Sequence, residues 1–377
     1  MQIVVNTRLL IKNRLDGMGW FSYQTLKRIT QKNPDVHFVF LFDRPFDESF
    51  IFSDNITPLV IGPQARHPFL YLAWFQGSVK NLLGRMNPDL FLSPDGFLCL
   101  GASCKQLPVI HDINFLHHPQ DSKWLTAKYY NYYFPRFAKA ASRIATVSEF
   151  SKQEISSHYR INPNNIDVVY NGIHDFFHPL SEAEKIATRT RYAAGSPYFV
   201  NVGALHPRKN IPALIEAFAL FKKQQSNPCK LVLAGPSYWG TQIISRTIEK
   251  FGLKNEVLLT GHLQDEELNK VLASAEALTF VPYYEGFGIP LVEAMQTETP
   301  IITSDVSSLP EVAGEAALLV NPHSPENISN AMHKVYTDKL LKQQLIEKGR
   351  TQKLLFSWDK SSDLLWKSIQ TTIHQKG

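Results

Sequence analysis

The chain has 377 residues, 44% of them hydrophobic and 19% charged, and a formal net charge of +5 at pH 7. This length suits two domains, and the composition is that of a globular protein able to build two hydrophobic cores. It argues against an integral membrane protein, because no stretch approaches the roughly 20 apolar residues that a membrane-spanning helix needs.

Short apolar strands alternate with amphipathic helices along the whole chain, a pattern typical of parallel α/β architecture. In the first half, strands are predicted at 3–6, 36–42, 89–93, 108–111, 143–147 and 166–170, with helices at 18–31, 68–85, 122–140 and 149–159. In the second half, strands are predicted at 198–202, 230–234, 257–260, 277–281, 300–303 and 317–320, each with a helix before the next strand. The predicted fold class is α/β, with two Rossmann-like domains.

The domain boundary is predicted just after Gly172, where a polar segment leaves the last strand of the first half. Ser181 and Glu184 have the spacing of a capping box and should start the first helix of the second half. We therefore expect a first domain over 1–175, a second over 176–356, and a C-terminal helix over 357–377 that packs back on the first domain.

The segment YYEGFGIPLVEAM, 283–295, follows a strand and feeds a helix through a glycine-rich turn. Pro290 suits the first helical turn, and the amides of that turn should favour a phosphate or sugar oxygen. Glu285 and Glu293 flank it with an E-x7-E spacing, and each carboxylate can accept hydrogen bonds from neighbouring hydroxyl groups. The alternative is a surface pair of glutamates beside a turn.

The segment YFVNVGALHPRKNI, 198–211, ends a strand at Gly203 and places Arg208 and Lys209 at the start of the next helix. Two cations there oppose the positive end of the helix dipole. We expect both to be largely exposed and to meet an anion such as a diphosphate. A solvated basic pair is the alternative.

Two features of the first half lie where α/β sheets bind ligands, beyond the carboxyl ends of strands. Gly17 and Gly19 in the loop 14–21 would allow close approach of a ligand to the backbone, although a structural turn explains them equally well. His111 ends a strand and could contact a substrate or only satisfy local backbone groups. His117 and His118 are interpreted as loop residues.

The sequence offers no support for a metal. It contains no D-x-D pair, and no histidine or carboxylate cluster has metal-ligand spacing. The three cysteines are equally sparse and favour a reducing compartment. With an N-terminus unlike a secretory signal, this predicts a soluble, cytoplasmic protein.

Two aromatic and basic helical segments, 67–85 and 123–143, leave a membrane role open. Such helices can lie on an anionic membrane and receive a lipid-linked acceptor, here at the inner face of the plasma membrane. An aromatic stripe is also typical of a buried helix face. The net charge does not distinguish these alternatives.

The motifs together resemble those of the retaining glycosyltransferases of family 4, which have the GT-B fold of two Rossmann-like domains facing a central cleft. The resemblance runs through most of the chain and is carried by VGALHPRKNI and EGFGIPLVEAM, with support from TVSEFSKQEI, VVYNGI and TGHLQDEEL. It implies that the first domain binds the acceptor and the second a nucleotide sugar. The PRKN form resembles a branch with many mannosyltransferases of bacterial surface polysaccharides, which makes GDP-mannose the leading donor.

The resemblance also implies roles for matching positions. The catalytic positions are His111, Glu285, Arg208 and Lys209. The donor-binding positions are Gly17, Gly203, Gly261, His262, Phe287, Gly288, Ile289 and Glu293. Two departures stand out: Asp16 replaces a frequent glycine, which brings an acidic group to the acceptor side, and Ala204 replaces an arginine that many members carry.

The function expected from the resemblance is metal-independent, retaining transfer of a hexose to a glycan or lipid-linked acceptor, with no cofactor beyond the nucleotide sugar. The alternatives are a UDP-sugar donor, a sugar-nucleotide epimerase on the same fold, and a non-catalytic protein that binds nucleotide sugars. A nucleic-acid partner is disfavoured because the basic residues are dispersed.

Overall fold

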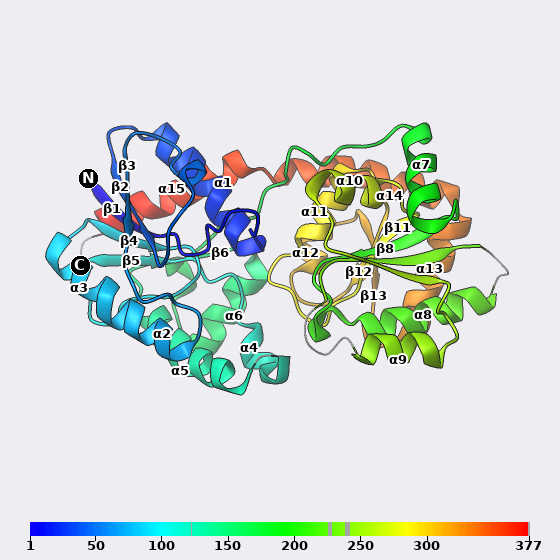
Figure 1. Cartoon of the computed structure of the whole chain (residues 1–377), viewed down its shortest axis with the longest axis horizontal. Helices are drawn as coiled ribbons and strands as arrows, with labels where there is room; N and C mark the ends of the chain where they lie inside the picture. The colour runs from blue at the N-terminus through cyan, green and yellow to red at the C-terminus, as the bar shows by residue number, and fades with distance from the viewer. Residues whose placement is uncertain (122, 225–227, 238–241, 376–377) are drawn as a thin grey trace. The chain divides into compact units, whose positions relative to one another are not determined.

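The structure is a computed structural model that describes residues 1–121, 123–224, 228–237 and 242–375. The chain divides into two compact units, one formed by Met1–Gly172 with Ser357–Gly377 and the other by Ile173–Phe356. Each unit has a parallel sheet with helices on both faces, as expected for the α/β class (Figure 1). None of the helices in the described ranges is both long and apolar enough to cross a bilayer.

The main sheet of the first unit has five parallel strands in the order β3-β2-β1-β4-β5. They are β1 (Gln2–Asn6), β2 (His37–Phe42), β3 (Ile56–Val60), β4 (Leu90–Ser93) and β5 (Lys105–Pro108). A two-stranded sheet, β6 (Ile144–Thr146) and β7 (Ile166–Val168), continues it through a bridge between Val109 and Ala145. The chain reverses its direction across the sheet between β1 and β4, which are neighbours in space but not in sequence.

The helices of the first unit pack on both faces of this sheet. They are α1 (Gly17–Lys32), α2 (Pro68–Tyr71), α3 (Lys80–Met86), α4 (Asn114–His117), α5 (Trp124–Ala140), α6 (Glu149–Tyr159) and α15 (Trp358–His374). A π-helical stretch, Leu72–Val79, joins α2 to α3, and short 3-10 turns lie at Glu48–Phe50, Pro119–Asp121 and Pro163–Asn165. The C-terminal helix α15 lies against α1 (Figure 1). Its Ser361 hydroxyl donates to the carbonyl of Tyr170.

The second unit has a six-stranded parallel sheet in the order β10-β9-β8-β11-β12-β13. The strands are β8 (Tyr198–Val202), β9 (Lys230–Ala234), β10 (Val257–Gly261), β11 (Ala277–Phe280), β12 (Ile301–Ser304) and β13 (Ala317–Val320). Here the reversal falls between β8 and β11. A helix lies between each strand and the next, and β8, β9 and β10 lie on one side of this reversal, with β11, β12 and β13 on the other.

The helices of the second unit form two layers. They are α7 (Glu182–Ala193), α8 (Ile211–Gln224), α9 (Gln242–Lys250), α10 (Asp265–Ala273), α11 (Ile289–Gln296), α12 (Leu309–Ala313), α13 (Pro325–Thr337) and α14 (Lys339–Gln352), with 3-10 turns at Pro207–Lys209 and Lys353–Leu355. Helices α8, α9 and α13 pack together over one core, which includes Phe199, Phe218 and Leu231. The capping box predicted at Ser181 and Glu184 is present at the start of α7.

Several predicted elements need correction. The edge strand β3 was not predicted, because Pro58 interrupts its pattern; proline is tolerated there only because β3 has one paired side. The strand predicted at 108–111 lies earlier, at β5, so that His111 follows the strand rather than ending it. The predicted start of the helix at Ser122 lies outside the described residues.

Candidate active site

The switch point of the second unit gathers the residues expected to bind the donor. In an open α/β sheet, ligands bind beyond the carboxyl ends of the strands where the strand order reverses. Here this position lies between β8 and β11, which pair through Ala277–Phe199 and Leu278–Val200. The turn Pro207–Lys209 follows β8, and Glu285 follows β11. The fold therefore brings two cations and one carboxylate, some 76 residues apart in sequence, to one edge.

Arg208 and Lys209 both pair with the same oxygen of Glu285, Oε1. Lys209 is buried, with its Nζ 4.5 Å from the centre of the Phe280 ring, whereas the Arg208 side chain keeps 25% of its exposure. The expectation that both cations are largely exposed is therefore wrong for Lys209. The anion that offsets them in the protein alone is Glu285, which the sequence analysis had assigned to the sugar.

The carboxylate of Glu285 is charged despite its position. Burial raises its pKa, but the charges of Arg208 and Lys209 and their hydrogen bonds outweigh burial and hold the pKa below its ordinary value. Two cations against one carboxylate leave this trio with a formal charge of +1. Such an excess at a buried strand edge favours an anionic ligand.

Glu293 has the opposite electrostatics. It lies in α11 and is buried, and burial together with the charge of Asp265 raises its pKa to about 8 although Lys209 acts against this shift. The carboxyl group is therefore mostly protonated at neutral pH and can donate as well as accept a hydrogen bond. Asp265, the first residue of α10, also has a raised pKa because of its burial, with His262 lowering it. Charge therefore couples the protonation of Glu293 to Asp265, and that of Asp265 to His262.

The turn before α11 has the local structure predicted for it. Gly288 is the N-cap, with φ of +94°, and Pro290 occupies the first helical turn. A Cβ at Gly288 would lie 2.6 Å from Leu309, so both backbone and space demand glycine. The side chain of Phe287 is buried and packs edge-on against Phe356, with ring centroids 5.5 Å apart. Only its main chain can therefore serve a ligand.

The same turn is fixed by the chain that follows β12. The Ser307 hydroxyl accepts from the Glu285 amide at 3.2 Å, and the Ser308 hydroxyl donates to the Glu285 carbonyl at 2.9 Å. Sequence reasoning missed both serines, because their contribution depends on β12 lying next to β11. Gly203 directly follows β8 and Gly261 is the last residue of β10, with positive φ angles of +125° and +70°, and Ile289 begins α11.

The remaining two predicted residues lie in the first unit. The ring of His111 packs edge-on against Phe21, and its Nε2 lies 2.9 Å from the Pro94 carbonyl. Because a carbonyl can only accept, the proton of the neutral ring belongs on Nε2 and leaves Nδ1 as the acceptor. Burial lowers the pKa of His111, against the Pro94 contact and nearby acidic groups, so the neutral ring is favoured.

Gly17 is the first residue of α1, and the preceding Asp16 is its N-cap. The Asp16 carboxylate accepts from the Gly19 amide at 2.9 Å. The acidic group that departs from the family pattern thus has a structural role in starting α1. A glycine at the same place would lack this hydrogen bond.

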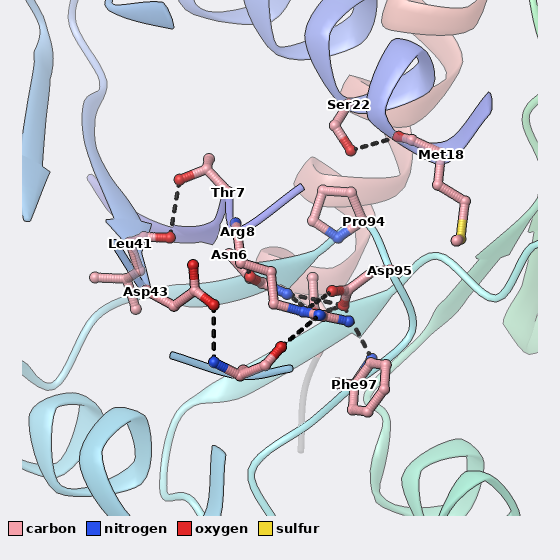
Figure 2. Close-up of polar contacts among 12 residues, drawn as sticks. Asn6, Thr7, Arg8, Met18, Ser22, Leu41, Asp43, Pro94, Asp95 and Phe97 are labelled. Carbon is pink, nitrogen blue, oxygen red and sulfur yellow. Dashed lines mark hydrogen bonds and ion pairs between the residues drawn. The ribbon is translucent and has the colours of Figure 1, made fainter. Parts of the chain in front are cut away.

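A buried ion pair in the first unit was missed by the sequence analysis. Arg8 follows β1 and Asp95 follows β4, so the pair occupies the switch point of this sheet, and Nε of Arg8 lies 2.5 Å from Asp95 Oδ2 (Figure 2). Asn6 and Ser93 donate to the other oxygen of Asp95, at 2.8 and 3.0 Å. His111 was selected because polar residues just beyond the end of a strand are candidates for ligand binding. Arg8 and Asp95 also follow strands, so the same criterion could have found them.

One group with metal-ligand chemistry comes together in the first unit, contrary to the sequence expectation. His117 of α4 lies beside Glu154 and His158 of α6, with one ligand atom from each within 4.8 Å of the others. The sequence spacing gave no sign of it, because His117 lies 37 residues before Glu154.

Two family models match the chain, one for each half. Residues 15–175 match the model described as Glycosyltransferase Family 4, and residues 182–352 match Glycosyl transferases group 1. Together they extend over most of the chain and over every predicted site residue.

Relatives in sequence include two proteins of Escherichia coli. The chain is 28% identical to O-antigen chain mannosyltransferase B over 260 residues, which covers 68% of this chain and 67% of the relative. It is also 28% identical over 230 residues to the serotype-specific mannosyltransferase WbdA, covering 59% of this chain but only 28% of that longer protein.

Solved structures with the same fold cover nearly the whole chain. Sucrose-phosphate synthase from Thermosynechococcus elongatus aligns with a TM-score of 0.77 at 17% identity, covering 97% of this chain and 98% of that one. Anabaena HepE in complex with UDP and glucose aligns with a TM-score of 0.76 at 16% identity, covering 98% of this chain and 100% of that one. At these identities the likeness concerns the fold alone, and it confirms the predicted GT-B class.

Proposed function

The chain belongs to the family 4 glycosyltransferases, and on that premise we propose that it transfers mannose from GDP-mannose, with retention of configuration, to a glycan or lipid-linked acceptor in the synthesis of a surface polysaccharide. The single observation that carries the proposal is the trio of Arg208, Lys209 and Glu285 at the switch point of the second unit. Its excess positive charge matches a nucleoside diphosphate, and its carboxylate lies beside the cations that would hold that diphosphate.

In the proposed reaction, the bond between the sugar C1 and the diphosphate oxygen breaks, and negative charge grows on the leaving diphosphate. Arg208 and Lys209 meet this charge, which is the kind of preorganised stabilisation that contributes most to catalysis. Both pair with Glu285 in the protein alone, so an arriving diphosphate would compete with that carboxylate for them. No metal ion has a part in this proposal.

The acceptor hydroxyl attacks from the face that the diphosphate leaves and gives its proton to that leaving group. This front-side course retains the configuration at C1 and requires no second catalytic carboxylate, unlike a pair of glycosidase carboxylates. Glu285 would hold hydroxyls of the donor sugar, and Glu293 would hold the ribose. The protonated state of Glu293 suits this role, because a neutral carboxyl can donate to one hydroxyl and accept from the other.

The choice of mannose rests on the sequence relatives, two of which are named mannosyltransferases. The donor is tested by thermal stabilisation and calorimetry with GDP, UDP and ADP. We expect GDP to bind most tightly, and GDP-mannose to support transfer to a membrane extract with an α-linked product by NMR. If UDP binds more tightly than GDP, the proposed donor is wrong, but the proposed enzyme class still holds.

Two other outcomes would overturn the enzyme class. Release of an epimerised free sugar without any acceptor would indicate a sugar-nucleotide epimerase. Tight donor binding with no turnover on any acceptor or water would indicate a binding protein. The transfer assay is repeated with Lys209→Ala. Transfer by the proposed route must depend on the Lys209 side chain, so this variant shows whether the measured activity is that of the proposed site.

Contact with an anionic membrane forms part of the proposal and rests on helix α5. Trp124, Lys128, Tyr132 and Arg136 recur every fourth residue, with Trp124 69% and Tyr132 52% exposed. The Lys128 Nζ lies 3.9 Å from the centre of the Trp124 ring, and the Arg136 guanidinium 3.5 Å from that of Tyr132. The opposite face, with Tyr129, Phe134 and Phe137, is core. The core interpretation therefore holds for this face, and the membrane interpretation is proposed for the exposed face.

Vesicle sedimentation tests this surface. The chain should sediment with vesicles containing phosphatidylglycerol but not with pure phosphatidylcholine, and Trp124→Ala with Lys128→Ala should abolish the difference. The control is Lys367→Ala with Leu364→Ala on the exposed side of α15, which should sediment like the unaltered chain. Equal sedimentation of both double variants would contradict the role of α5.

A further inference from the structure

A second site for a ligand lies in the first unit, apart from the residues assigned to the donor. We propose that His117, Glu154 and His158 bind a divalent transition-metal ion, with Zn²⁺ the best match. The imidazole Nε2 of His117 hydrogen-bonds to the Glu154 carboxylate, and Nδ1 of His158 lies 3.9 Å from its other oxygen. The two imidazole rings pack edge-on with their centroids 5.0 Å apart, and the Glu154 carboxylate lies beside both.

The positions of these three side chains follow from two helices. Glu154 and His158 are four residues apart in α6 and so project from the same face of the helix. His117 is the last residue of α4, and from there its side chain reaches the face of α6 that carries Glu154 and His158. The ring of His158 is oriented further by its Nδ1, which lies 3.0 Å from the Glu154 carbonyl. A ligand histidine typically has its ring fixed by such a contact to a backbone carbonyl.

The chemistry of the donor set selects the class of ion. Two imidazoles and one carboxylate suit Zn²⁺ and its neighbours, whereas Mg²⁺ and Ca²⁺ prefer sets made of oxygen alone. In the metal-free protein a proton lies between His117 Nε2 and the Glu154 carboxylate. When an ion binds, the neutral His117 ring carries its proton on Nδ1, so that the Nε2 lone pair and the Glu154 carboxylate both face the ion. The side chains retain 20 to 36% of their exposure, so water can complete the coordination.

The location suggests what the ion does. Helix α6 already holds the segment that carries His111, because the Ser151 hydroxyl donates to the His111 carbonyl at 3.0 Å. His117 lies six residues further along the same segment. An ion shared by α4 and α6 would hold both ends of the segment 111–117 to α6. The site therefore restrains the backbone around His111 and takes no part in the transfer chemistry, so it stands or falls independently of the proposed donor.

Binding is measured on the full chain without an added histidine tag, after removal of metals with a chelator. Calorimetry should give one Zn²⁺ per chain, and Co²⁺ should give visible absorption bands of a site with nitrogen ligands. His158→Ala and Glu154→Gln should each weaken Zn²⁺ binding by at least about 10- to 100-fold and remove the Co²⁺ bands. Mg²⁺ should neither bind nor compete.

The chain provides a matched control in α15. His374 has the same contact from Nδ1 to a backbone carbonyl four residues earlier, at 2.8 Å, but Gln370 stands where α6 has a glutamate. His374→Ala should bind Zn²⁺ like the unaltered chain, and circular dichroism should show all variants folded. Zn²⁺ binding that is absent from the unaltered chain, or equal in His158→Ala and His374→Ala, would overturn the proposal.

Discussion

The two switch points of this protein are built alike but differ in charge. In the first unit Arg8 follows β1 and Asp95 follows β4, and in the second Lys209 follows β8 and Glu285 follows β11. Each is a buried ion pair at the carboxyl edge of a parallel sheet. Parallel strands alone explain this likeness, because residues that follow neighbouring strands emerge at the same edge.

The first pair is balanced and enclosed. The Arg8 and Asp95 side chains are 9% and 3% exposed, and the guanidinium lies among the rings of Tyr71, Phe75 and Phe97, 4.8 to 5.8 Å from their centres. The second has two cations on one carboxylate and a more exposed Arg208. We infer that the first pair organises its unit, whereas the surplus cation of the second, its reserve charge, would meet the diphosphate of the proposed donor.

The largest effect is expected from breaking the balanced pair. Arg8→Ala leaves Asp95 buried and charged without its cation, which should lower the free energy of unfolding by about 3–5 kcal/mol. Urea unfolding measures it, and the exposed pair of Lys12 and Asp47 supplies the control Lys12→Ala, which should change little. Combining Arg8→Met with Asp95→Asn should recover part of the loss. If single and double variants are equally unstable, the charge of Asp95 is not the cause.

A smaller effect, on rate more than on stability, is expected at the second switch point. Lys209→Ala leaves Glu285 paired with Arg208, so the fold keeps a balanced pair but loses the reserve charge. The transfer rate should drop by about 100- to 1,000-fold, which corresponds to about 2.7–4 kcal/mol of barrier. Initial rates and melting curves measure the two effects together. Lys185→Ala on the exposed face of α7 is the control, and normal turnover in Lys209→Ala would contradict the diphosphate assignment.

The two glutamates of the second unit should respond differently to pH. The pKa of Glu293 is raised from 4.5 to about 8, so between these values the folded chain keeps a proton that the unfolded chain has lost. Its contribution to stability is complete below the ordinary pKa and is lost as the pH rises toward 8, by about 1.4 kcal/mol per pH unit. Glu293→Gln should therefore flatten the stability profile between pH 5.5 and 8, as urea unfolding can show.

Glu285→Gln is the matched control for this profile. The pKa of the Glu285 carboxyl is lowered, so its contribution to stability is present above the ordinary pKa of glutamate and is lost only in acid. The window from pH 5.5 to 8 should keep its slope in this variant. A slope that persists in Glu293→Gln, or vanishes in Glu285→Gln, would reverse the assignment of protonation states.

Much of this organisation could be predicted from sequence because it follows local patterns. The alternation of strands and helices, the capping box of Ser181 and the turn before α11 depend on neighbouring residues. The pairing of Arg208 and Lys209 with Glu285 could not be predicted, because it requires knowing that β8 and β11 are adjacent. The same limit hid the pair of Arg8 and Asp95. Burial of Lys209 follows from its partner and could not be inferred from the helix start alone.

The same two glutamates should also divide binding from catalysis. Glu293→Ala, which removes both the donor and the acceptor, should mainly weaken the binding of GDP, because ribose contacts are alike in ground and transition states. Glu285→Gln should lower the maximal rate yet bind GDP at least as tightly, since removing its charge releases Arg208 and Lys209 for the diphosphate. Calorimetry measures the binding of GDP, and initial rates measure turnover. Loss of GDP binding in Glu285→Gln with none in Glu293→Ala would place the donor the other way round.

Removing metal ions is expected to have the smallest effect, with essentially no change in the transfer rate. In many sugar transferases a metal ion neutralises the diphosphate. In the proposed mechanism Arg208 and Lys209, which both pair with Glu285, would take that role. Transfer should therefore continue in EDTA with a maximal rate close to that of the untreated enzyme. If the proposed Zn²⁺ site restrains the segment around His111, its loss should appear in the melting curve and not as a requirement for turnover. Adding Mg²⁺ to Lys209→Ala sharpens the test. If Mg²⁺ can replace the missing cation, it should raise the transfer rate of this variant and leave that of the unaltered chain unchanged. Complete loss of transfer in EDTA, restored by Mg²⁺ or Mn²⁺ in the unaltered chain, would mean that the charge at the second switch point is not sufficient for the leaving diphosphate.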